Sequence, residues 1–110
     1  MIIDPAITFA TTEWDLLPDE RHEGERGFAL WKVIHAGTIR IRRVEYSPGY
    51  SADHWCSKGH IIYCINGEMT TELNDGRTFV LKKGMSYHVG DNSGSHRSFT
   101  ESGATLFIVD

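Results

Sequence analysis

Apolar and polar residues alternate with a period of two along most of this 110-residue chain. Successive side chains of a strand point to opposite faces, so this period is typical of half-buried β-strands. It predicts strands over 28–35 and 38–46, joined by a turn at Ala36-Gly37. Further short strands are expected at 60–66, 69–73, 77–81, 85–89, 96–100 and 104–110.

Two of these stretches depart from simple alternation. In 38–46 the apolar residues change parity after Ile41, which predicts a β-bulge at Arg42-Arg43, because a regular strand keeps its faces. The stretch 60–66 is almost continuously apolar, as expected for a strand that is covered on both faces.

Turn residues separate the predicted strands. Gly67-Glu68 and Asn74-Asp75-Gly76 predict tight turns. The segment 11–20 could form a short helical turn, with Thr11 or Thr12 as its N-cap and Pro18 as its end. Many short strands between glycine turns indicate an all-β sandwich or barrel, and jelly-roll or closed forms leave the fewest exposed edges.

Composition and charge narrow the class of partner. Hydrophobic residues make up 40% of the chain and charged residues 24%, which is ordinary for one soluble globular domain. The net charge of −4 argues against nucleic acid or an anionic membrane as partner, because both require a basic surface. The sequence contains no transmembrane run and no signal-peptide pattern. We therefore expect a cytoplasmic protein with reduced thiols.

The candidate chemistry is concentrated in the stretch 49–67. His54 and Cys56 are two residues apart, so on an extended chain they face the same side. Gly59 permits a sharp bend that can aim His60 at the same point. Imidazole and thiolate donors that converge in this way are typical of a transition-metal site, although the spacing also fits a polar barrel end without metal.

This stretch resembles the first motif of the cupin superfamily, which runs from a glycine through H-x-H and a glutamate to a closing glycine. His54 and Cys56 stand at the two histidine positions, His60 at the glutamate position and Gly67 at the closing glycine. In the second cupin motif, the histidine position falls on His96.

More specifically, "DHWCSKGH" and "HRSFTESGATLFIVD" resemble the small single-domain DHCW-motif cupin fold proteins. The resemblance covers about residues 28–110, which makes 28–110 the cupin barrel domain and 1–27 an N-terminal extension. It implies a double-stranded β-helix (a jelly-roll barrel) and a homodimer. It also implies a small-molecule pocket at the barrel mouth and a divalent transition metal such as Zn, Fe, Ni or Mn. The ligands of that metal would be His54, Cys56, His60 and His96.

Three classes of function fit this interpretation. The protein could be an enzyme with an open metal position, a binding or sensing module without turnover, or a barrel with a purely structural metal. Three protein ligands plus water favour the first two classes, and four protein ligands favour the third. A cysteine nucleophile paired with a histidine is a weaker alternative, because nothing marks an oxyanion hole.

The other polar and sulfur-containing residues have mostly structural interpretations. Cys64 shares the parity of His60 and is expected in the core. Trp55 is expected to face the outside of the barrel or a subunit contact. The remaining residues are expected on the surface, at the core edge or pointing away from the site: His22, His35, Arg40, Arg42, Arg43, Tyr63, His88 and Arg97. Two less favoured alternatives stay open: the basic cluster Arg40, Arg42 and Arg43 could contact an anionic substrate, and His88 could line the pocket mouth.

Overall fold

The computed structural model describes residues 2–110; Met1, the first residue of the predicted extension, lies outside the described residues. Within 2–110 the chain forms eight β-strands, a short 3₁₀ helix and no α-helix. No helix in this part of the chain is long and apolar enough to cross a membrane. The strands are β1 (Glu20–Glu23), β2 (Phe28–Ala36), β3 (Ile39–Tyr46), β4 (His60–Leu73), β5 (Thr78–Lys82), β6 (Ser86–Val89), β7 (His96–Phe99) and β8 (Ala104–Val109).

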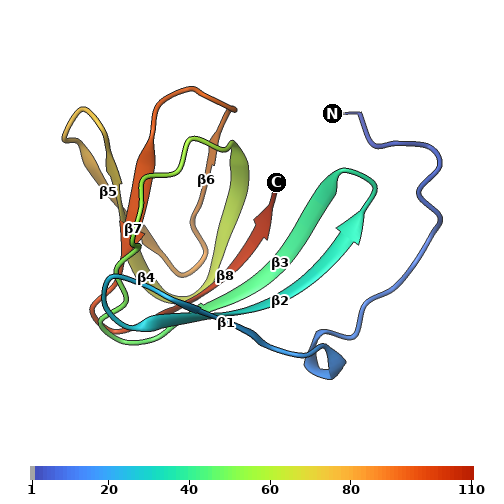
Figure 1. Cartoon of the computed structure of the whole chain (residues 1–110), viewed down its shortest axis with the longest axis horizontal. Coiled ribbons are helices and arrows are strands. Elements are labelled where there is room, and N and C mark those ends of the chain that lie inside the picture. Colours follow the sequence, from blue (N-terminus) through green and yellow to red (C-terminus); the bar gives the residue numbers. More distant parts are fainter. Residues whose placement is uncertain (1) are drawn as a thin grey trace.

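The strands are arranged in two layers that curve around an interior (Figure 1). The larger layer contains β1, β2, β3, β8 and the first half of β4, with β6 on the other side of β4. The smaller layer contains the second half of β4 between β5 and β7. All of these pairings are antiparallel, and the all-β single-domain fold predicted from the alternation is confirmed.

Strand β4 joins the two layers, and this corrects the predicted turn at Gly67-Glu68. The chain does not reverse there but continues as one strand of 14 residues. A register shift between Cys64 and Asn66, followed by a φ of 73° at Gly67, redirects the strand from one layer to the other. A side chain at Gly67 would clash with the carbonyl oxygen of Gly103, so the bend also requires close backbone approach.

The predicted bulge in β3 is absent, because the pairings of β3 with β2 and β8 keep an unbroken register. Arg42 is instead only 6% exposed and shares the interior face with the buried Val44. The strand therefore keeps its faces. Along its interior face the residues change from polar to apolar, and in the sequence this looks like a change of parity. The expectation of a solvated arginine face holds only for Arg43, which reaches outward to Asp15 at 3.4 Å.

The core lies between the layers and consists of side chains with the parity that the strand pattern predicts. Cys64 is fully buried there, as expected, and both cysteines are free thiols. The buried hydrophobic residues are Ala29, Val44, Ile62, Cys64, Met69, Leu81, Ala104, Leu106 and Ile108.

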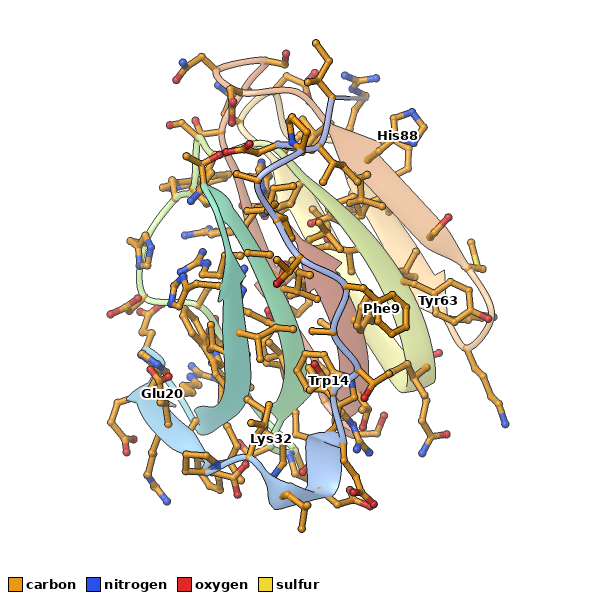
Figure 2. The ribbon with its side chains drawn as sticks, turned by 90° about the vertical axis from the view of Figure 1, so that its right-hand side faces the viewer. Phe9, Trp14, Glu20, Lys32, Tyr63 and His88 are labelled. Carbon is orange, nitrogen blue, oxygen red and sulfur yellow. The ribbon has the colours of Figure 1, made fainter. Side chains whose placement is uncertain are left out.

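The N-terminal segment crosses the outer face of the larger layer (Figure 2). The predicted helical turn is present as η1 (Trp14–Leu16), but its N-cap is Glu13, which makes no side-chain capping bond. Trp14 packs edge-to-face on Phe107 of β8, with ring centroids 5.9 Å apart. Strand β1 lies inside the predicted extension and pairs with β2, while the domain boundary at residue 28 stays a prediction.

The outer face of β4 is not covered, which contradicts the prediction for 60–66. Ile61 and Tyr63 are each 47% exposed and Ile65 is 38% exposed. The alternate residues of the same strand, such as Ile62, fill the core, so the continuous apolar run reflects two different faces. Figure 2 shows the Tyr63 side chain on this face.

Candidate metal centre

Cys56, His60 and His96 bring their donor atoms together on the wall of an interior cavity. The sulfur and the imidazole nitrogens lie within 4.8 Å of one another. The two Nε2 atoms of the histidines are 2.8 Å apart, although the residues are separated by 36 positions in the sequence. His96 is 3% exposed, and the side chain of His60 is 8% exposed. The structure therefore unites three of the four ligands predicted from the sequence.

Each donor is placed by a different part of the fold. His60 begins β4 in the larger layer, and His96 begins β7 in the smaller layer. Cys56 lies in the loop before β4 and exchanges two backbone hydrogen bonds with His96, of 2.8 Å and 2.9 Å. This bridge holds the loop against β7, so the site connects the two layers at one end of the interior.

Gly59 positions the loop differently from our expectation. It does not adopt the left-handed conformation that would justify a glycine at a sharp bend. A side chain at Gly59 would instead lie 2.6 Å from the backbone nitrogen of Asp91, and the Gly59 amide donates a 2.7 Å bond to the Asp91 carboxylate. A glycine is thus needed at position 59 so that the loop can lie close to the Asp91 backbone. This contact fixes the direction of the chain just before His60.

The outer ring nitrogens of the two histidines face acceptors. His96 Nδ1 lies 3.5 Å from the carbonyl oxygen of Gly94, and His60 Nδ1 lies 3.7 Å from Asp110 Oδ2. The second distance is too long for a hydrogen bond and leaves a buried nitrogen without a partner. When each Nδ1 carries the proton, each Nε2 has a free lone pair, and the two lone pairs point at the same place. A cation bound there would remove the repulsion between the two lone pairs. This geometry fits a metal.

The protonation states near the site also suit metal binding. Burial, and then the neighbouring His96, lowers the pKa of His60 to about 4. Its imidazole is therefore neutral near pH 7, which is the form that binds metal. The hydroxyl of Tyr87 lies 3.4 Å from His60 Nε2, and burial raises the pKa of Tyr87 to about 12, so that the phenol keeps its proton.

One sulfur and two imidazole nitrogens form a borderline-to-soft donor set. Such a set suits Zn and other later first-row ions, whereas Ca and Mg prefer oxygen ligands. The cavity beside the donors has a volume of about 160 Å³, so a metal there would have one side facing open space.

His54 lies outside the group. Its ring is 76% exposed, and its Nδ1 is 2.5 Å from the Asp53 carboxylate. The parity argument assumed an extended chain, but residues 53–54 form a bend, so His54 and Cys56 do not share a face. His54 still borders the cavity, and its role as a metal ligand stays a prediction.

The sequence interpretation missed a charged cluster beside the metal donors. Asp110 has a side-chain exposure of 1% and accepts two bonds of 3.0 Å from Arg40 and one of 3.0 Å from Arg42. The signal was present, because Asp110 continues the parity of Leu106 and Ile108 on the interior face of β8.

The other single-residue expectations have mixed outcomes. His35 and His88 are exposed, as predicted. His22 is half-buried instead, because its ring stacks on Trp31 with centroids 3.8 Å apart. Trp55 is 40% exposed and lies under the Arg97 guanidinium at 4.4 Å, in agreement with an outward orientation.

No protein-family model and no curated protein sequence matches this chain. Solved structures resemble it at low identity. Ectoine synthase from P. lautus is 16% identical with a TM-score of 0.74, over 92% of this chain and 76% of that chain. A predicted oxalate decarboxylase from Thermotoga maritima is 17% identical with a TM-score of 0.74, over 91% and 96%. An RmlC-like cupin from Shewanella frigidimarina is 17% identical with a TM-score of 0.71, over 94% and 90%. The chain therefore has the all-β, single-domain cupin fold that its sequence motifs predict.

Proposed function

We propose that the protein is a metal-binding cupin in which Cys56, His60 and His96 hold a divalent transition metal beside a small-molecule cavity. The convergence of these three donors on the cavity wall carries the proposal. The Nε2 atoms of His60 and His96 lie 2.8 Å apart, and a bound metal would accept both lone pairs and fix both rings. Of Zn, Fe, Ni and Mn, the thiolate donor favours the first three, because Mn prefers oxygen ligands.

The open side of the donor group favours a site for a ligand or substrate over a closed structural metal. Three protein donors leave at least one coordination position for water or another molecule. A bound ion would act there as a Lewis acid on an oxygen group of the ligand. The same arrangement serves an enzyme and a non-catalytic sensor, and turnover of a bound ligand distinguishes the two.

Metal analysis of the purified protein tests the proposal directly. We expect about one transition-metal ion per chain after purification or after reconstitution with Zn, Fe or Ni salts. A protein that retains none of these ions after removal of excess metal would contradict the proposed function.

Replacement of Cys56 by serine is expected to weaken metal retention and to shift preference toward harder ions, because a hydroxyl is a poor substitute for a soft thiolate. Cys64→Ser is the matched control, since Cys64 is buried in the core and lies outside the donor group. We expect its metal content to stay near that of the wild type. Equal losses in both variants, measured by elemental analysis, would remove Cys56 from the ligand set.

We infer that the chain belongs to the cupin superfamily and, within it, to the DHCW-motif proteins. The contacts of residues 53–56 support this assignment. Asp53 binds His54, Trp55 packs under Arg97 at the cavity edge, and Cys56 joins the metal donors. All four motif residues therefore contribute to the same loop at the cavity. Free thiols at both cysteines are consistent with the cytoplasmic location that we propose.

We propose that two copies associate through the outer face of β4. Ile61, Tyr63 and Ile65 form an exposed apolar strip there. A strip of this kind usually marks an interface, and two-fold dimers are the commonest assemblies.

Light scattering at micromolar concentration should therefore give twice the 12.4 kDa mass of one chain. Tyr63→Glu is expected to shift the mass toward that of a monomer, because it buries a charge at the proposed interface. Phe79→Glu, at a 52% exposed position of β5 in the smaller layer, is the control and should stay dimeric. A wild-type protein that is monomeric throughout would count against the dimer.

A further inference from the structure

The cavity is positively charged although the whole chain carries a net charge of −4. Arg40, Arg42 and Arg97 line it, and Asp110 is the single carboxylate among the described lining residues. Arg97 is neutralised outside the cavity by Glu72 at 2.9 Å. The two remaining guanidiniums face one carboxylate, which leaves an excess positive charge even before a metal is bound.

The excess positive charge of the cavity lies on Arg42. Arg40 donates to both oxygens of Asp110, whereas Arg42 makes a single 3.0 Å bond to Oδ2. Its Nε is buried without a hydrogen-bond partner, and its side chain is 7% exposed. A guanidinium has five donors and does not lose its charge in proteins, so the buried Arg42 is left incompletely compensated.

Arg42 is also held rigidly and close to the metal donors. Its guanidinium lies over the ring of Trp31, 4.3 Å from the centroid. Asp110 Oδ2 lies 3.0 Å from Arg42 and 3.7 Å from His60, so one carboxylate oxygen separates the arginine from a metal ligand. Arg42 and the three metal donors also line the same cavity, so a single small molecule in it can contact both.

We infer that the cavity binds a short-chain carboxylate, whose carboxylate group pairs with Arg42 while a neighbouring oxygen faces the metal; this rests on the proposed function. The planar guanidinium matches a carboxylate in shape and charge. The cavity volume of about 160 Å³ limits the ligand to a small molecule, since a cavity of roughly 150 Å³ holds benzene.

The test uses the full-length protein loaded with Co²⁺, whose visible spectrum reports both metal binding and changes in coordination. Glycolate is titrated as the probe, and its uncharged amide glycolamide is the matched control. We expect glycolate to change the spectrum with an affinity at least about tenfold higher than glycolamide, as for the loss of a bond to a charged group. Equal affinities would overturn the inference while leaving metal binding intact. Failure to bind Co²⁺ would overturn the proposed function and the inference with it.

Arg42→Met tests the assigned residue. We expect it to lower glycolate affinity at least about tenfold with an unchanged cobalt spectrum, and Arg42→Lys to retain part of that affinity. Arg43→Met, on the outward face of the same strand, is the control and should bind glycolate as the wild type does. Wild-type affinity in Arg42→Met would assign the residue a structural role. Should that variant not fold, the wild-type comparison of glycolate with glycolamide decides the outcome.

Discussion

Replacement of His96 by alanine is expected to abolish metal retention and the stability that the metal confers. His96 supplies one of three donors, and its Nε2 lies 2.8 Å from that of His60. An ion present at about 100 times its dissociation constant adds about 2.7 kcal/mol to the free energy of unfolding, and the variant would lose this increment. The melting temperature, measured with and without added metal, should show a metal-dependent shift in the wild type only.

Two further alanine variants make this result specific. His35→Ala, at an exposed position of β2, should retain both metal and the metal-dependent shift. His54→Ala tests the fourth predicted ligand: a loss as severe as that of His96→Ala would make His54 a ligand, and full retention would exclude it. Full metal retention in His96→Ala itself would show that the second cupin motif is misassigned.

Replacement of Gly67 by alanine is expected to destabilise the fold by roughly 2–5 kcal/mol, from a left-handed backbone and a steric clash together. Gly67 has a φ of 73°, and a Cβ there would approach Gly103 and lie 3.0 Å from the Cα of Ala104. Chemical denaturation measures the loss as a reduced free energy of unfolding.

Gly84→Ala separates the two causes. Gly84 has a similar φ of 86°, but no atom lies within 4 Å of the position that its Cβ would take. This variant should lose only about 1–2 kcal/mol, the cost of the left-handed conformation alone. If both variants lost the same amount, the close approach at Gly67 would not contribute to stability.

The pattern of apolar and polar residues predicted every strand between residues 28 and 110 to within one residue at each outer boundary. It did so because each strand buries one face against the same core. The prediction failed where the type of residue did not reveal the course of the backbone. Gly67 has the conformation of a turn residue, but its position between the two layers makes it a bend in a continuous strand. Strand β1 is four residues of mostly exposed polar chain, so it has no apolar period to detect.

The candidate site was only partly accessible from sequence for a different reason. Cys56 and His60 are close in the chain, but His96 joins them through the pairing of distant strands, which only the motif resemblance indicated. His54 was placed by a parity rule that does not apply to a bend. Arg42 was misjudged because a charged residue on an interior face looks like a break in an apolar pattern.

The continuous course of β4 makes the metal position sensitive to the angle between the two layers. His60 lies at one end of β4, and His96 pairs with Leu73 at the other end, with the bend at Gly67 between them. Each half of the strand is a lever arm of roughly 20 Å, so a rotation of about 5° at the bend displaces the far end by about 2 Å. Metal–ligand distances tolerate changes of only about 0.2 Å. Metal coordination would therefore be sensitive to rotations of about half a degree at Gly67, far from the site itself.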